Sequence, residues 1–215
     1  MTKAEVIKQI RDTGVVPVVR ATTTDEAMRA IDAIREGGIS VLEITMTVPG
    51  AVALIEQVAR RYGKETVVGA GTVLDAETAQ ACISSGAQFI VSPSLNTGTI
   101  DYCHRQEVVV MPGALTPTEV VQAWNAGADF VKVFPAGAVG GASYIKALKA
   151  PLPQIELVPT GGVSLTTAGD FIRAGAAALG VGTDLVDLKA IREGHAKLIT
   201  ERAKQFVEIV REARL

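Results

Sequence analysis

Residues 126–135 read AGADFVKVFP, in which a glycine turn leads directly into a short run of β-branched and aromatic residues that ends at a proline. The turn, a small residue followed by Gly–Ala, recurs as Ser85–Gly86–Ala87 and as Ala174–Gly175–Ala176, each time just before another run of this kind. Glycine after the last turn of a helix takes up a left-handed conformation that other residues avoid. The recurrence indicates a chain built from repeated helix–turn–strand units.

Eight such apolar runs follow one another along the chain, and their starts lie about 19 to 26 residues apart. They cover residues 15–19, 41–45, 66–71, 89–93, 108–112, 130–135, 156–161 and 178–182. Strict alternation of strand and helix favours parallel strands with right-handed crossovers, and eight similar units favour closure into a barrel. The sequence therefore predicts an α/β fold, a single (β/α)8 TIM barrel with an extra N-terminal helix, as one domain over residues 1–215.

Composition excludes several classes of function. Hydrophobic residues make up 48% of the chain and charged residues 20%, which predicts a large packed core. The formal net charge of −2 provides no basic surface for nucleic acid or acidic lipid, so we expect neither as a partner. No apolar run approaches the ~20 residues of a membrane span, and residues 1–14 lack the core of a signal peptide. We expect a cytoplasmic protein.

Two charged residues stand at strand positions where a barrel interior is normally apolar. Alternate residues of each strand point inward, which places Phe130, Lys132 and Phe134 on the interior side of their strand. The same alternation sends Glu43 inward from residues 41–45. Burying either charge alone is unfavourable, so each must be paired, neutralised or used in chemistry.

Two interpretations of this lysine and glutamate remain open. The first is a structural ion pair between Glu43 and Lys132. The second is catalysis, in which a desolvated lysine attacks a carbonyl carbon and the neighbouring carboxylate moves protons. Phe130 and Phe134 favour catalysis, because aromatic rings on both sides of a lysine supply the desolvation.

Polar residues also follow the strands at their carboxyl ends, where the active sites of barrels form. Arg20 follows the first predicted strand, Thr72 follows the third, and Pro93 closes the fourth. An arginine at this face can bind a carboxylate through two parallel hydrogen bonds. The alternative for Arg20 is a solvated residue at the rim.

Glycines mark the ends of the last two predicted strands. Gly161, Gly162 and Gly182, with Thr183, present backbone N–H groups close to a short helix that we expect at residues 184–187. Such a cluster is the usual phosphate site of these barrels, although the glycines are also compatible with tight turns alone. The two histidines, His104 and His195, fall outside this face and are too few for a metal-dependent active site.

Together these strings resemble the family of 2-dehydro-3-deoxy-6-phosphogluconate (KDPG) aldolase, a class I aldolase family that overlaps with 4-hydroxy-2-oxoglutarate aldolase. The resemblance extends over nearly the whole chain in the same order. It is carried by LEITMTVPGA (42–51), VGAGTV (68–73), FIVSPSL (89–95), MPGALTPTE (111–119), VKVFPA (131–136) and PTGGV (159–163).

The resemblance implies a role for each residue that matches it. Lys132 would form the Schiff base and Glu43 would be the general acid and base. The remaining residues would bind substrate: Thr72 would contact the keto acid, Pro93 and Phe134 would shape the pocket, and Gly161, Gly162, Gly182 and Thr183 would hold the phosphate.

Two positions depart from the family pattern. Many members have an arginine four residues beyond the glutamate, where this chain has Thr47, and Arg20 is the expected substitute for binding the substrate carboxylate. The second departure is Asp184, whose negative charge beside the expected phosphate site disfavours phosphate and keeps a non-phosphorylated substrate open.

The resemblance implies cleavage of 2-keto-3-deoxy-6-phosphogluconate to pyruvate and glyceraldehyde 3-phosphate, and of 4-hydroxy-2-oxoglutarate to pyruvate and glyoxylate. It implies a homotrimer that binds a small 2-keto acid and needs neither a metal nor an organic cofactor. The galactonate-derived and non-phosphorylated 2-keto-3-deoxy acids remain alternative substrates. A phosphosugar isomerase or epimerase, and a barrel that serves only as a scaffold, remain alternative functions.

Overall fold

The computed structural model describes residues 1–215. The strands are β1 (Val15–Val19), β2 (Val41–Thr45), β3 (Val67–Gly71), β4 (Phe89–Val91), β5 (Val109–Met111), β6 (Gly113–Ala114), β7 (Val131–Val133), β8 (Leu157–Pro159) and β9 (Leu179–Val181). The helices are α1 (Lys3–Thr13), α2 (Thr24–Glu36), α3 (Ala51–Tyr62), α4 (Ala76–Ser84), α5 (Thr97–Arg105), α6 (Pro117–Asn125), α7 (Ala142–Lys149), α8 (Ala168–Arg173), α9 (Leu188–Arg192) and α10 (Lys197–Ala213). Short 3-10 turns, η1 (Gly63–Glu65) and η2 (Ala136–Val139), complete the regular elements.

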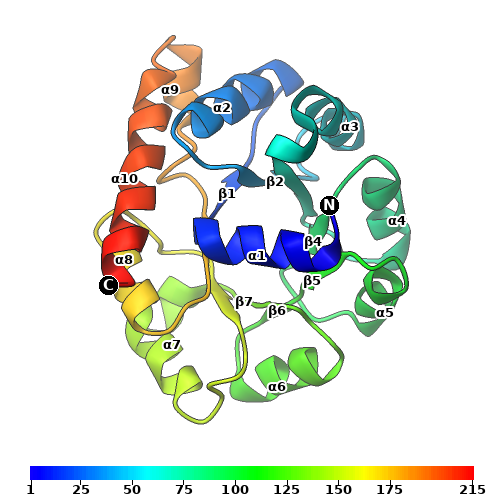
Figure 1. The fold of residues 1–215 in the computed structure, drawn as a ribbon, viewed down its shortest axis with the longest axis vertical. Helices are drawn as coiled ribbons and strands as arrows, with labels where there is room; N and C mark the ends of the chain where they lie inside the picture. The colour runs from blue at the N-terminus through cyan, green and yellow to red at the C-terminus, as the bar shows by residue number, and fades with distance from the viewer.

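All strand pairs are parallel, and they form two sheets. One sheet has six strands in the order β5-β4-β3-β2-β1-β9, and the other has three in the order β6-β7-β8. Helices surround the strands on the outside (Figure 1). The prediction of an α/β fold with parallel strands is confirmed.

The predicted run at residues 108–112 ends at Pro112, and this proline separates β5 from the two-residue strand β6, which was not predicted. Proline has no N–H to donate to a strand ladder, which explains the break at this position. At the other junction, a single parallel bridge between Thr160 and Gly180 connects the end of β8 to β9. The ladders therefore form two neighbouring sheets, with one continuous chain segment and one bridge between them.

Apolar side chains form two groups on opposite sides of the strands. Val131 and Val133 belong to the outer group, which packs between strands and helices, whereas Phe130 belongs to the interior group. The predicted alternation in this strand is thus confirmed. No helix is both long enough and apolar enough to cross a membrane.

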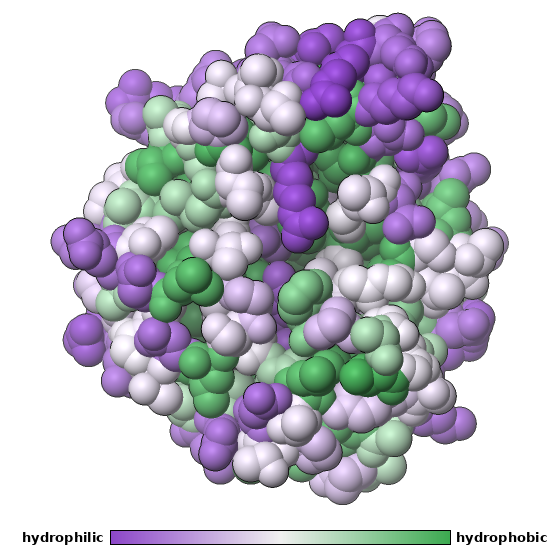
Figure 2. Space-filling model, turned by 180° about the vertical axis from the view of Figure 1, so that it is seen from behind, coloured by the Kyte–Doolittle hydropathy of each residue, from purple (hydrophilic) through white to green (hydrophobic).

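Helix α1 closes the interior at the amino ends of the strands, and it is the predicted N-terminal helix. Thr2 and Glu5 form a capping box that starts the helix. Its buried residues, Val6 and Ile10, pack in the interior group together with Phe130. The helix crosses the centre of the ring of elements in Figure 1. The opposite face is hollowed near its middle (Figure 2).

Candidate active site

Lys132 lies in β7, and only 7% of it is exposed. Its backbone N–H donates a hydrogen bond to the carbonyl oxygen of Pro112 at 2.9 Å, which fixes the strand position. Phe130, two residues earlier on the same side, is fully buried, and the lysine Nζ lies 5.4 Å from the centre of the Phe134 ring. The amine therefore lies beside the Phe134 ring, and Phe130 is buried on the same side of the strand.

Glu43 lies in β2 and is 3% exposed, so its carboxyl group is almost completely removed from water. Burial raises the pKa of Glu43 above its ordinary value, and the positive charges of Lys132 and Arg20 offset part of this increase. The strands place it through pairing with β1, where Glu43 lies opposite Val18, and with β3, where it lies opposite Gly69.

Glu43 and Lys132 do not form an ion pair, since no oxygen of one lies within 4.0 Å of the nitrogen of the other. They are nevertheless close enough for the lysine charge to act on the Glu43 pKa. The structural ion pair that the sequence left open is therefore not formed. A buried amine and a buried carboxyl face the same interior without being bonded to each other.

Thr47 is held by hydrogen bonds among the ends of the first two strands. The hydroxyl of Thr45 donates to the carbonyl oxygen of Val19 at 3.1 Å and shares a 2.7 Å hydrogen bond with the hydroxyl of Thr47. Thr47 itself is exposed, as is Arg20, the residue that follows Val19. This network joins Thr47, the first departure from the family pattern, to the strand end that carries Arg20.

The loop after β1 is fixed by Glu26. Its carboxylate accepts hydrogen bonds from the backbone N–H of Thr22 at 3.1 Å, from the Thr22 hydroxyl at 2.6 Å and from Arg192 Nε at 2.6 Å. The Arg192 hydrogen bond, followed by those of Thr22, lowers the pKa of Glu26 to about 2. Glu26 thereby connects the loop beside Arg20 to α9.

A cavity of about 130 Å³, here called the glycine cavity, brings together six of the predicted binding residues. They are Arg20, Phe134, Gly161, Gly162, Gly182 and Thr183. Lys132 and Glu43 do not line it, but both are near residues that do, because Phe134 contacts the lysine amine and Arg20 acts on the Glu43 pKa. The cavity thus lies beside the buried amine and carboxyl.

The turn after β8 requires glycine. Gly161 and Gly162 have φ angles of +84° and +77°, values that favour glycine. A Cβ on Gly162 would also lie 2.8 Å from the Cα of Gly137. Gly137 donates a backbone hydrogen bond to Gly161 at 2.9 Å, which packs η2 directly against this turn. Both the tight-turn reading and an anion site with bare backbone remain compatible with this geometry.

The predicted helix at residues 184–187 is wrong. The segment is a turn, in which the N–H groups of Leu185 and Val186 donate to the carbonyl oxygen of Gly182 at 3.1 and 2.9 Å. Helix α9 begins at Leu188, because Asp187 is its N-cap and accepts a hydrogen bond from the N–H of Ala190. An aspartate suits a cap better than a helix interior, and this preference sets the boundary.

Thr72 and Pro93 lie at the carboxyl ends of β3 and β4, outside the glycine cavity, and both are half-buried. Thr72 directly follows Gly71, which contacts Glu43. Pro93 packs against β6, since a Cβ on Gly113 would lie 2.2 Å from its carbonyl oxygen. Thr72 is thus placed beside Glu43, whereas Pro93 lies beside Gly113, the residue of β6 that pairs with Lys132.

Sequence reasoning missed Thr160 as a site residue. It is 7% exposed and lines the glycine cavity, and a Cβ on Gly180 would lie 2.1 Å from its Oγ1. Two signals were available: Thr160 belongs to the PTGGV string, and it shares the interior parity of Val158.

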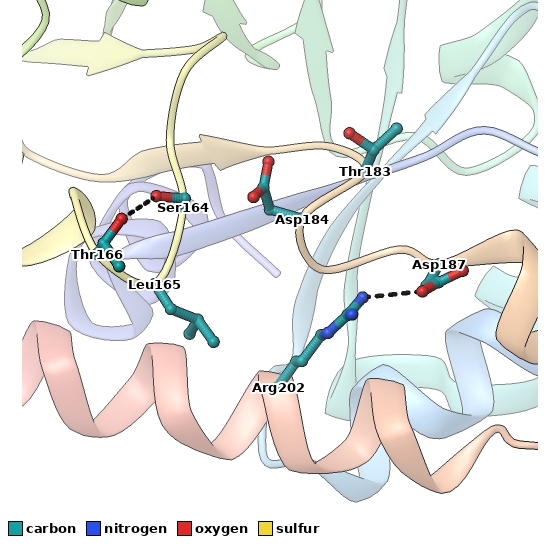
Figure 3. A pocket seen from close by; sticks show the side chains of 7 residues that line it. All are labelled: Ser164, Leu165, Thr166, Thr183, Asp184, Asp187 and Arg202. Atoms are coloured by element: carbon teal, nitrogen blue, oxygen red, sulfur yellow. Dashed lines mark hydrogen bonds and ion pairs between the residues drawn. The ribbon is translucent and has the colours of Figure 1, made fainter.

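A second, larger cavity of about 460 Å³ adjoins the first, and it is called the outer cavity below. The two share Thr183 and Asp184. Its other lining residues are Ser164, Leu165, Thr166, Asp187 and Arg202, which come from the turn after β8, the segment before α9, and α10 (Figure 3).

Comparison with known proteins places this arrangement in a family. A family model described as KDPG and KHG aldolase matches residues 6–202. The chain belongs to this aldolase family.

Relatives of this aldolase match it over nearly their full length. The chain is 36% identical to 2-dehydro-3-deoxy-6-phosphogalactonate aldolase of Escherichia coli, covering 92% of this chain and 95% of that protein. It is 31% identical to 2-dehydro-3-deoxy-phosphogluconate aldolase of Haemophilus influenzae, with coverage of 98% and 99%.

A solved KDPG aldolase from Legionella pneumophila superimposes on this aldolase with a TM-score of 0.85. The two are 28% identical, and the match covers 93% of this chain and 96% of that one. That crystal structure contains pyruvate captured at low pH as a covalent carbinolamine intermediate. The family resemblance predicted from the sequence strings is confirmed.

Proposed function

We propose that this protein is a class I aldolase that cleaves 2-keto-3-deoxy-6-phosphogluconate to pyruvate and glyceraldehyde 3-phosphate, and 4-hydroxy-2-oxoglutarate to pyruvate and glyoxylate. The observation that carries the proposal is the buried Lys132, whose amine lies beside Phe134 and near, but not bonded to, the buried Glu43. The covalent pyruvate intermediate of the Legionella relative supports the same chemistry here.

In the proposed reaction, the Lys132 amine attacks the C2 carbonyl of the keto acid and forms a carbinolamine. Glu43 transfers protons so that water leaves and a protonated imine remains. Its raised pKa suits this task, because a carboxyl group that titrates closer to neutrality both gives and takes protons readily.

Carbon–carbon cleavage follows from the imine. Glu43 takes the proton of the C4 hydroxyl, the C3–C4 bond breaks, and the bonding electrons move into the imine to give an enamine. The aldehyde leaves, C3 takes up a proton, and water hydrolyses the imine to release pyruvate and free Lys132. We propose that no metal is required, because the protonated imine itself acts as the electron sink.

The proposed binding roles follow the positions of the remaining residues. Arg20 would bind the substrate carboxylate, with Thr47 standing where many relatives have arginine. Thr72, Pro93 and Phe134 would border the keto acid. The backbone of Gly161, Gly162, Gly182 and Thr183 would bind the phosphate, since these residues line one cavity beside Phe134.

A galactonate-derived substrate, with the opposite configuration at C4, is the second candidate. The E. coli relative at 36% identity is named for the phosphogalactonate reaction. The two candidates use the same lysine chemistry, so they differ only in which C4 epimer releases pyruvate faster.

We further propose that both sheets belong to one (β/α)8 barrel and that residues 1–215 form one domain. Three features support closure: Met111 and Gly113 flank a single proline, a bridge joins Thr160 to Gly180, and α1 caps the common interior. From the family resemblance we propose a cytoplasmic homotrimer, and light scattering on the purified protein would measure the subunit number.

Borohydride reduction in the presence of pyruvate tests the proposal. A Schiff-base aldolase gains a stable adduct mass on the peptide that contains Lys132. An isomerase or an inert scaffold gains none. Measuring pyruvate release from both C4 epimers would then separate the gluconate from the galactonate substrate.

A further inference from the structure

Asp184 is an unpaired carboxylate at the junction of the glycine cavity and the outer cavity. It lines both, it is exposed, and no ion pair or hydrogen bond of its side chain is formed within the chain. Figure 3 shows its carboxylate between the Ser164 turn and Thr183. Asp187, by contrast, is bound to Arg202 at 3.2 Å and caps α9.

The position of Asp184 matters because it directly follows Gly182 and Thr183, which carry backbone N–H groups of the proposed phosphate site. A phosphate monoester has close to two negative charges at neutral pH. A carboxylate beside it is repulsive, and the cation of the outer cavity, Arg202, is already paired with Asp187. Arg20 is the other charged residue that lines the glycine cavity.

A substrate hydroxyl group in the position of the phosphate would be attracted to Asp184 rather than repelled, because it can donate a hydrogen bond to the carboxylate. The outer cavity provides further polar partners in the hydroxyls of Ser164 and Thr166, which lie 2.9 Å apart. A volume of about 460 Å³ leaves room there for the end of a polyhydroxy chain.

We infer that Asp184 determines selectivity at the aldehyde end of the substrate, by reducing the preference for phosphorylated over non-phosphorylated 2-keto-3-deoxy acids. It does so by repelling the phosphate and by accepting a hydrogen bond from the terminal hydroxyl group of the unphosphorylated substrate. This inference rests on the proposed aldolase function and specifies its substrate class.

The test compares kcat/KM for 2-keto-3-deoxy-6-phosphogluconate and 2-keto-3-deoxygluconate in the unsubstituted enzyme and in Asp184→Asn. The ratio of the two values is expected to rise by roughly 10-fold in favour of the phosphorylated substrate, the size of a carboxylate–phosphate repulsion across a few ångströms of water. Raising the ionic strength should shrink the difference between the two enzymes, because salt screens exposed charges. Asp101→Asn is the matched control, since it removes an exposed carboxylate from α5, away from both cavities.

An unchanged ratio in Asp184→Asn, or an equal fall for both substrates, would overturn the inference and leave the aldolase proposal intact. A change of the same size in Asp101→Asn would also overturn it, because net charge would then be the cause. Failure of the unsubstituted enzyme to form a borohydride-stable pyruvate adduct would instead refute the proposed function itself.

Discussion

Gly71 leaves no room for a side chain beside Glu43, because a Cβ at position 71 would lie 2.2 Å from the glutamate Oε1. The backbone of β3 thus packs directly against the buried carboxyl group of Glu43. The glycine is tied to the position of the proposed acid–base group rather than to a turn.

Gly71→Ala is therefore expected to displace the Glu43 carboxylate and to lower kcat by about 10²-fold, the scale associated with a misplacement of about 1 Å in a catalytic group. Steady-state kinetics would measure the loss, and thermal unfolding would verify that the variant folds. Gly98→Ala, in helix α5, is the matched control, since its nearest neighbour would be Asn96 Oδ1 at 3.3 Å. A normal kcat in Gly71→Ala would show that the contact has no catalytic role.

Lys132→Met is expected to abolish turnover and the borohydride-trapped pyruvate adduct while leaving the fold intact. Methionine has a similar length and suits an apolar interior, so circular dichroism and the unfolding temperature should change little. Lys146→Met removes an exposed lysine from α7 and should retain both activity and adduct. Near-normal turnover by the Lys132 variant would eliminate the Schiff-base mechanism.

Glu43→Gln is expected to slow catalysis by about 10²-fold or more, because the amide cannot exchange protons. Burial raises the pKa of Glu43 above its ordinary 4.5, so in the unsubstituted enzyme the acidic limb of the pH–rate profile should lie above pH 4.5. That limb should disappear in the variant. An unchanged rate and profile would remove Glu43 from its proposed role.

Arg20→Met tests whether Arg20 binds the substrate carboxylate. We expect KM for the keto acid to rise roughly 10- to 100-fold, the equivalent of a hydrogen-bonded charge pair, with a smaller effect on kcat. Adding Thr47→Arg to this variant should recover part of the loss, because it restores a guanidinium near the same strand ends, which Thr45 links through Val19. An unaltered KM in Arg20→Met would leave the carboxylate without its proposed partner.

Glu26→Gln tests the network that fixes the loop before α2. The pKa of Glu26 is lowered to about 2 in the folded protein, against an ordinary value of 4.5. A lowered pKa stabilises the fold above about pH 4.5, and the contribution is lost as the pH falls from there toward 2. The variant should therefore unfold at a lower temperature at pH 7 and lose less stability than the unsubstituted protein between pH 5 and pH 3. Parallel unfolding curves for the two proteins would contradict this.

The interior positions of the site were predictable because strand alternation is strictly local. In residues 130–134, valines alternate with the two phenylalanines and the lysine, so the side of the strand that each residue occupies follows from the sequence alone. The same rule placed Glu43 inside. What it did not predict was the separation of the two charges, since that depends on how far apart β2 and β7 lie across the interior.

Other errors had local physical causes. The predicted strand at residues 108–112 included Pro112, which lacks a donor, and it did not include β6 beyond the proline. Helix α9 begins later than predicted because the Asp187 side chain caps it. Strand alternation and the PTGGV string both favoured Thr160, but its contact with Gly180 of another strand was not visible in the sequence. Contacts between distant segments leave no periodic signal in a sequence.

Helix α1 blocks the amino end of the interior with Val6 and Ile10, so in the proposed reaction we expect substrate to reach Lys132 from the opposite face. In that reaction the pyruvate carbons stay covalently bound to Lys132 after the C3–C4 bond breaks, whereas the aldehyde is free to leave. We therefore expect ordered product release, in which the aldehyde departs first and pyruvate last. In the synthetic direction the same covalent attachment requires pyruvate to bind before the aldehyde.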